Sequence, residues 1–233
     1  MAAIFPLIRN WPTSRETVGT AFVISDDGHF ATAAHIPEST PEFVFTAAPN
    51  PEDLKSTAAI EWLFISPQYD LAVGKLVAKP TDSPLVLAIS LPEMDAPVEA
   101  FGFPASPATF FRDGKYLQIA RPMIRRKATF RGYSADYNIG PSSDIHGFNY
   151  AARKMTAVLT SPPFPEGFSG GPVMDARGRV IGVNSSTQSD RALMVRLNNG
   201  NPFAVNAGAD ALMNLLQLKD RPLFDRVLAA AKS

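Results

Sequence analysis

Three residues that lie far apart in the sequence, His35, Asp70 and Ser169, could together turn a hydroxyl group into a nucleophile. A serine hydroxyl alone attacks carbonyl groups poorly. It becomes reactive when a neighbouring imidazole accepts its proton and a buried carboxylate orients that imidazole. Because the chain has no cysteine, oxygen nucleophiles are the ones to expect.

The surroundings of the serine carry the most information. Residues 167–172 read Gly-Phe-Ser-Gly-Gly-Pro and follow a proline-rich stretch, residues 161–166. A glycine two residues before the serine permits backbone conformations that a Cβ would penalise, so the N–H groups of Gly167 and Ser169 can point into one concavity. This arrangement predicts an oxyanion hole. Alone, such a string is compatible with an ordinary loop.

The histidine and the aspartate each stand at the edge of an apolar segment. His35 ends a run of small residues that begins after Phe30, and Asp70 directly precedes the apolar residues 71–76. Taken singly, Asp70 fits a turn residue that leads into a strand. The other histidines, His29 and His146, lack a motif and are expected to be exposed in loops.

Composition narrows the classes of function. The 22 basic residues balance 22 acidic ones, which argues against a globally basic nucleic-acid binder. With three histidines and no cysteine, we expect no metal and no cofactor. The sequence contains no run of roughly 18 apolar residues, and its start lacks the basic region of a signal peptide. We therefore expect a cytoplasmic protein without a membrane partner.

A local basic run is the one strong charge feature. It consists of Arg121, Arg125, Arg126, Lys127 and Arg131. Two interpretations stay open: a solvated strand edge protected by its charges, or a docking surface for an acidic partner.

The elements that must position these residues are mostly short strands. Residues 17–36 predict a hairpin around the Asp-Gly pair at 27–28, and short apolar runs recur to residue 206 between Pro, Gly, Ser and Asp. This texture predicts an all-β sandwich or barrel. A long surface loop is expected between Gly132 and Gly147. Two helices are expected at the end, the first capped by Asn206 and the second beginning near Pro222, both packed on a barrel.

Three motifs in one order resemble a known superfamily. Thr-Ala-Ala-His at 32–35, Tyr-Asp-Leu-Ala-Val at 69–73 and Gly-Phe-Ser-Gly-Gly-Pro at 167–172 resemble the chymotrypsin/trypsin-like serine proteases. Asp-Leu-Ala-Val and Phe-Ala-Val at 203–205 look most like the bacterial peptidases related to HtrA and Deg. The resemblance extends from Val18 to about Leu216.

The resemblance implies two antiparallel six-stranded β-barrels. Residues 1–95 would form the first barrel, residues 96–206 the second, and residues 207–233 helices packed on them. His35 would be the general base, Asp70 would orient it, Ser169 would attack, and Gly167 with Ser169 would donate to the oxyanion. The function implied is a serine endopeptidase acting on protein or peptide substrates through an acyl-enzyme.

Substrate recognition is expected around the nucleophile turn and the strand after Gly182. The residues that the resemblance assigns to it are Pro163, Glu166, Ser185, Ser186 and Thr187. Pro163 stands where trypsin carries an acidic residue, so we expect cleavage after small or medium apolar residues and not after Arg or Lys.

Two departures keep alternatives open. Phe168 stands where digestive relatives carry the aspartate that pairs with a newly cut N-terminus, so activation by that ion pair is not expected. We also expect a bare protease module without a PDZ domain. The alternatives are a catalytically silent pseudoprotease that binds peptides in the cleft between the barrels, and a protease effector switched on by a partner protein.

Overall fold

The first six strands close into a barrel. The structure is a computed structural model that describes residues 3–10, 14–38, 44–47, 57–104, 109–112, 115–116, 122–139, 142–143, 149–150, 153–188, 194–195 and 198–233. The strands of the first barrel are β1 (Ile4–Asn10), β2 (Ser14–Val23), β3 (His29–Thr32), β4 (Val44–Ala47), β5 (Ala58–Ser66) and β6 (Leu71–Leu76). Their order is β1-β4-β5-β6-β3-β2, and β2 pairs back with β1.

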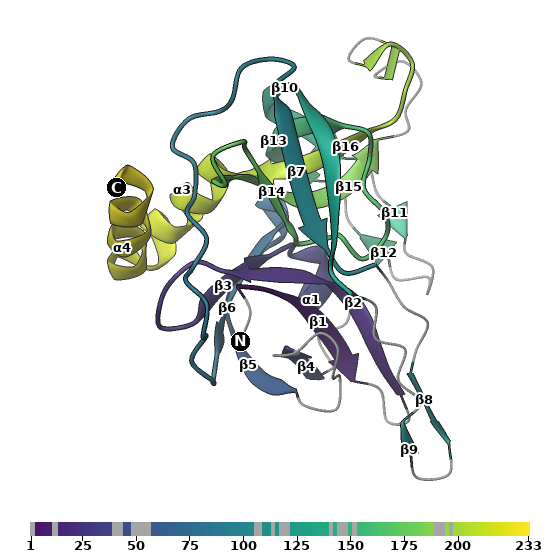
Figure 1. The fold of residues 1–233 in the computed structure, drawn as a ribbon, viewed down its shortest axis with the longest axis vertical. Helices are drawn as coiled ribbons and strands as arrows, with labels where there is room; N and C mark the ends of the chain where they lie inside the picture. Colours follow the sequence, from purple (N-terminus) through teal and green to yellow (C-terminus); the bar gives the residue numbers. More distant parts are fainter. Residues whose placement is uncertain are drawn as a thin grey trace.

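Six later strands close into a second antiparallel barrel, which lies above the first in Figure 1. They are β7 (Pro97–Gly102), β10 (Ile124–Ile139), β13 (Arg153–Ser161), β14 (Pro172–Met174), β15 (Val180–Gln188) and β16 (Phe203–Gly208). The prediction of two antiparallel six-stranded barrels is therefore confirmed. Two short hairpins complete the strands: β8 (Thr109–Arg112) with β9 (Lys115–Tyr116), and β11 (Ser142–Ser143) with β12 (Asn149–Tyr150). Although it follows β7 in the chain, β8 also pairs with β2 of the first barrel.

The prediction of a long loop from Gly132 onward is wrong for its first part, because β10 continues to Ile139 and pairs there with β13. Gly132 has a φ of +138° and lies at a register shift of this ladder. It marks a β-bulge, where glycine is favoured as it is in loops. Residues 140–141 and 144–147 of the predicted loop lie outside the described residues.

Two helices follow the second barrel, as the sequence predicts, but the first begins later than expected. α3 (Ala209–Lys219) has Gly208 as its N-cap, and α4 (Arg221–Lys232) is capped by the Asp220 carboxylate, which accepts from the Leu223 N–H at 2.9 Å. The predicted cap, Asn206, lies instead in β16 and is fully buried. Its backbone pairs with strands on both sides, so it cannot take the place of a cap.

One apolar core joins the barrels to the helices. It contains Phe22 and Leu71 of the first barrel, Val183 of the second, and Leu212 and Leu223 of the helices. The helices pack beside the junction of the barrels, where Figure 1 draws them in yellow. This shared core fixes the two barrels relative to each other, and any site at their junction depends on it.

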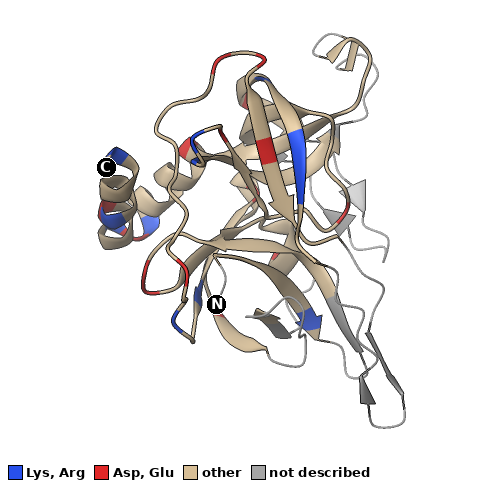
Figure 2. Ribbon diagram, in the orientation of Figure 1, with Lys and Arg blue, Asp and Glu red and all other residues tan. Residues whose placement is uncertain are grey.

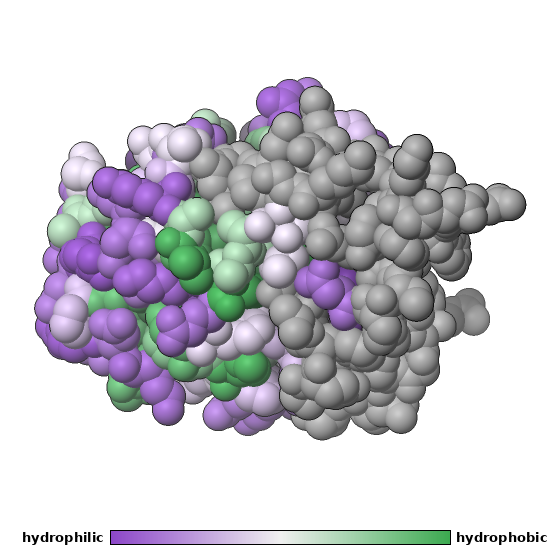
Figure 3. Space-filling view, turned by 90° about the horizontal axis from the view of Figure 1, so that it is seen from below, coloured by the Kyte–Doolittle hydropathy of each residue, from purple (hydrophilic) through white to green (hydrophobic). Residues whose placement is uncertain are grey.

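The surface carries both signs of charge. Figure 2 shows the basic run of β10 beside an acidic position of β7, and Arg125 lies 3.5 Å from Glu99 there. Arg131 pairs with Asp95, whereas Arg121 lies outside the described residues. On the described part of the face in Figure 3, hydrophobic residues form small areas between hydrophilic ones. No helix within the described ranges is long and apolar enough to span a membrane.

Candidate active site

His35 and Asp70 meet because they flank two paired strands at the same edge of the first barrel. β3 and β6 are antiparallel, with Thr32 opposite Ala72. His35 follows Thr32 by three residues and begins the short helix α1 (His35–Glu38), while Asp70 precedes Ala72 by two residues. The imidazole Nδ1 of His35 lies 2.9 Å from Asp70 Oδ2 and 3.1 Å from Oδ1.

The Asp70 carboxylate is fully buried and receives donors from several directions. The backbone N–H of His35 donates to Oδ1 at 2.9 Å, and the Ser185 hydroxyl donates to Oδ2. A 3₁₀ turn, η1 (Pro67–Tyr69), delivers Asp70 in a left-handed backbone conformation, with φ 50° and ψ 43°. Aspartate tolerates this conformation better than most residues. Such a set of donors holds the carboxylate in one orientation towards the imidazole.

The turn that carries Ser169 needs its glycines. It connects β13 to β14, and Gly167 and Gly170 have φ values of +89° and +81°. A Cβ at Gly170 would lie 2.0 Å from the Thr32 hydroxyl and 2.2 Å from the Thr20 carbonyl oxygen. The left-handed φ and the close approach both exclude a side chain there. The glycines thus let the serine turn press against the first barrel.

The backbone N–H groups of the serine turn differ in whether they donate to the described residues. Neither the Gly167 N–H nor the Ser169 N–H donates to any described residue. By contrast, the N–H groups of Phe168, Gly170 and Gly171 all donate within the protein, to Pro165, Asn184 and Phe168. Free amide donors beside a serine can stabilise a developing oxyanion.

Thr20 of β2 holds the serine turn from the first barrel, and the sequence analysis missed it. Its N–H donates to the Ser169 carbonyl at 2.8 Å, and its hydroxyl donates to the Gly167 carbonyl at 2.9 Å. Thr20 is fully buried and also accepts from the Phe103 N–H. A lone hydroxyl in the apolar run 18–24 is the signal that could have identified it.

Phe168, the residue before the serine, is anchored in the core of the second barrel. Its side chain is fully buried, and its ring stacks on Phe164 with centroids 6.0 Å apart and an interplanar angle of 17°. A Cβ at Gly102 would lie 2.7 Å from the Phe168 ring, so glycine makes room for it. A buried aromatic ring therefore holds the residue before the serine, at the position expected to carry an ion-paired aspartate in the digestive proteases.

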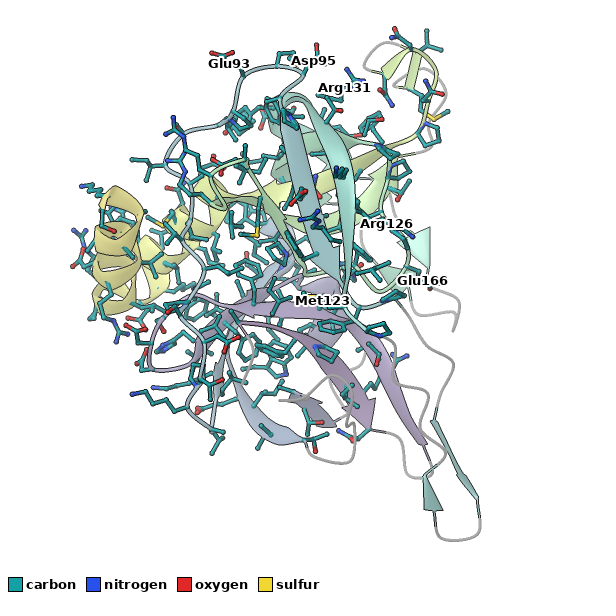
Figure 4. All side chains as sticks on the ribbon, in the orientation of Figure 1. Glu93, Asp95, Met123, Arg126, Arg131 and Glu166 are labelled. Carbon is teal, nitrogen blue, oxygen red and sulfur yellow. The ribbon has the colours of Figure 1, made fainter. Side chains whose placement is uncertain are left out.

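The residues expected around the substrate lie in different environments. Pro163 is half-buried, and Glu166 is exposed on the side of the second barrel where Arg126 also lies (Figure 4). Ser185 is buried with its hydroxyl on Asp70. Farther along β15, Ser186 is half-buried and Thr187 is exposed. The strand thus runs from the Asp70 contact outward to the surface.

The prediction that His29 is an exposed loop residue is wrong. It lies in β3 with 6% exposure, and its Nδ1 is 2.9 Å from the Ser25 hydroxyl and 2.8 Å from Asp27 Oδ1. The hairpin turn folds these three side chains together. His146 lies outside the described residues, and within the described ranges no three His, Asp or Glu side chains could hold a metal ion.

Several solved protease structures share this fold. The Rv3671c protease of M. tuberculosis in its active form is 19% identical, with a TM-score of 0.64 over 94% of this chain and 81% of that chain. The MamO protease domain of Magnetospirillum magneticum is 15% identical, with a TM-score of 0.61 over 92% and 96%. Deg5 is 17% identical, with a TM-score of 0.57 over 91% and 86%.

A family comparison goes beyond the fold. No match to a curated protein was found. Residues 19–183, well over half of the chain, match the family described as the trypsin-like peptidase domain. The matched range includes His35, Asp70 and Ser169. This chain therefore belongs to the trypsin-like peptidase family.

Proposed function

We propose that the protein is a serine endopeptidase in which Ser169 is the nucleophile, His35 the general base and Asp70 the residue that orients the base. The observation that carries this proposal is the buried Asp70 carboxylate on His35 Nδ1. A carboxylate there keeps the proton on Nδ1, so that Nε2 is the nitrogen that can accept one. Membership of the peptidase family supports it, as do the N–H groups of Gly167 and Ser169, which donate to no described residue.

The proposed reaction has two halves. The Ser169 oxygen bonds to the carbonyl carbon of the substrate while its proton moves to His35 Nε2, and the N–H groups of Gly167 and Ser169 stabilise the oxyanion. The C–N bond then breaks as His35 returns the proton to the amine, leaving an acyl-enzyme. Water, deprotonated by His35, then bonds to the acyl carbon. The bond from that carbon to the Ser169 oxygen breaks, the carboxylic acid leaves, and His35 returns the proton to Ser169. Asp70 stays ionised throughout and stabilises the imidazolium.

Labelling and digestion together test this function. A fluorophosphonate reagent should label the wild-type protein at Ser169 and should fail to label the His35→Ala variant, because the hydroxyl needs the imidazole to become reactive. A peptide-library digest should show cleavage by the wild type and none by Ser169→Ala. A protein that binds peptides without labelling or cleavage would instead be the pseudoprotease.

A partner-activated effector would give a third pattern. The purified protein would then be idle and would become reactive towards the fluorophosphonate only after a partner protein is added. Labelling of the purified protein by itself would contradict that alternative.

A further inference from the structure

Two buried asparagines, Asn184 and Asn206, lie near the serine turn. Asn184 is 6% exposed and Asn206 is fully buried, and neither Oδ1 accepts a hydrogen bond from the described residues. Leaving a buried polar atom unpaired is costly, so such atoms in a native protein call for an explanation. A ligand that brings donors to both oxygens would supply one.

Both amides face the interior of the second barrel. The β15–β16 ladder places Asn184 opposite Asn206, and the β13–β16 ladder places Asn206 opposite Val158. Directly opposed residues of antiparallel strands project from the same face of the sheet. Val158 belongs to the apolar cluster that receives side chains from all six strands of this barrel. The two asparagines are therefore a polar part of the barrel interior.

The polar row formed by Asn184 and Asn206 lies next to the serine turn. The Gly170 N–H donates to the Asn184 carbonyl at 2.7 Å, and the Asn184 N–H donates to the Gly171 carbonyl at 2.8 Å. The next residue, Ser185, donates its hydroxyl to Asp70. In the proposed reaction the attacked carbonyl lies at Ser169, and Asn184 is hydrogen-bonded to the two residues that follow Ser169. The side chain of the attacked residue is then the part of the substrate nearest to the two asparagines.

The orientation of one amide is fixed by its neighbours. Asn206 Nδ2 donates to the Val158 carbonyl at 2.8 Å and to the Thr160 hydroxyl at 3.2 Å. Rotating the amide would set its oxygen against the Val158 carbonyl oxygen, which cannot donate, so Asn206 presents an acceptor to any ligand. A substrate carboxylate would place its oxygens against that acceptor.

The substrate side chain that matches these two acceptor oxygens is neutral and donates hydrogen bonds. A carboxamide has two N–H donors, one for each free oxygen, whereas a hydroxyl has one. The ammonium group of lysine has donors as well, but neither asparagine offsets its charge in a buried position. Resting on the proposed peptidase function, we infer that Asn184 and Asn206 select substrates with glutamine or asparagine on the amino side of the cleaved bond. This inference differs from the apolar preference expected from Pro163, and a digest decides between the two.

A peptide-library digest tests the inference separately from the function. We expect most Ser169-dependent cuts to follow Gln or Asn. Cuts that depend on Ser169 but fall mainly after apolar or basic residues would overturn the inference and leave the peptidase function standing. If no sequence is cut in a Ser169-dependent way, both are overturned.

The variant Asn184→Val separates substrate recognition from a structural role. Because Asn184 makes no side-chain hydrogen bond to the described residues, valine should leave Tm unchanged or raise it. The preference in kcat/KM for a Gln peptide over the matched Leu peptide should fall by about tenfold to a hundredfold. A lowered Tm with an unchanged preference would show that the amide is structural, and would contradict the inference.

Val183→Ala is the matched control. Val183 is the preceding residue of β15, fully buried on the opposite face, where it packs in the core shared with α3. Its truncation should lower Tm and leave the Gln-to-Leu preference as it is in the wild type. An equal loss of preference in this control would mean that the Asn184→Val effect reflects a general loosening of the strand.

Discussion

The first barrel contains two histidine–aspartate pairs with nearly the same geometry but different surroundings. His35 Nδ1 lies 2.9 Å from Asp70, and His29 Nδ1 lies 2.8 Å from Asp27. A serine hydroxyl donates to each carboxylate, from Ser185 to Asp70 and from Ser25 to Asp27. The distance between imidazole and carboxylate therefore does not distinguish the two groups.

Their surroundings differ in charge and access. Asp70 is fully buried and faces the junction of the barrels, whereas the Asp27 side chain is 40% exposed and also meets Arg226 at 3.2 Å and Lys75 at 3.6 Å. The Ser25 hydroxyl contacts the same His29 nitrogen as Asp27 does, so the serine is not placed to be activated by the other nitrogen. The pair at Asp70 is therefore the one placed for the proposed catalysis. The pair at Asp27 links the hairpin of β2 and β3 to α4 through Arg226.

The largest expected difference in kcat/KM is between variants of the two histidines. His35→Ala should lower kcat/KM by roughly 10⁶-fold, because the members of a catalytic triad act as a unit. His29→Ala should leave kcat/KM of the folded protein within about threefold, since that ring contacts no reacting group. Steady-state assays of both variants, with circular dichroism to verify folding, measure this. Comparable losses in the two variants would contradict the distinction between the pairs.

Variants of the two aspartates should show the next largest difference in turnover. Asp70→Asn should lower turnover by about 10⁴-fold with the fold intact, because an amide would favour the wrong imidazole tautomer towards Ser169. Asp27→Asn is the control and should leave turnover close to that of the wild type. A decrease of less than about tenfold for Asp70→Asn would mean that another group orients His35.

Truncation of Phe168, the buried ring next to Ser169, should have an intermediate effect on activity. Phe168→Ala removes a fully buried ring and should destabilise the protein by about 3–5 kcal/mol. It should also lower kcat about 10²-fold in the folded protein, because a displacement of about 1 Å at the serine turn is enough for such a loss. Urea unfolding and active-site titration separate the two effects.

Phe5→Ala is the matched control for Phe168→Ala. Phe5 is equally buried, but it packs in the core of the first barrel against Phe30. It should lose similar stability and keep its kcat. If Phe5→Ala lost kcat to the same extent, the effect of Phe168→Ala would be one of general stability and not of the turn.

Local patterns in the sequence predict the parts of the site that depend on neighbouring residues. Small residues before His35, an apolar strand after Asp70 and glycines around Ser169 are each visible within about six residues. The barrels are also predictable, because short apolar runs with turn residues between them leave few other folds. The contact of His35 with Asp70 then follows from the pairing of adjacent strands.

The parts that were missed depend on strand register. The side chain of Thr20 reaches the serine turn, and that of Asn184 faces the interior of the second barrel, only because β2 and β15 take particular registers. A local sequence pattern does not reveal those registers. Gly132 is compatible with a loop or a bulge until its partner strand is known. The burial of His29 was foreseeable, since a tight turn brings residues 25 and 29 together.

The smallest expected effect concerns the link of Asp27 to α4. Partial burial tends to raise the pKa of the Asp27 carboxyl, but hydrogen bonds from Ser25, His29 and Arg226 outweigh it and hold the pKa well below its usual value. A pKa lowered in the folded state stabilises the protein above the unfolded value of about 3.9, and this stabilisation is lost as the pH falls further. Because the carboxylate is 40% exposed, solvent limits the contribution to about 1 kcal/mol or less.

Thermal unfolding as a function of pH tests this sign. At pH 7, Asp27→Asn should lower Tm by no more than about 2–4 °C, and the gap to the wild type should narrow as the pH falls below about 4. Asp26→Asn is the control, because Asp26 is exposed and makes no ion pair with a described residue, and it should leave Tm unchanged. A gap that widens in acid would mean that the folded protein stabilises the protonated carboxyl. Asp27 would then not be the anion that ties the hairpin to Arg226, and the contrast with Asp70 would rest on access alone.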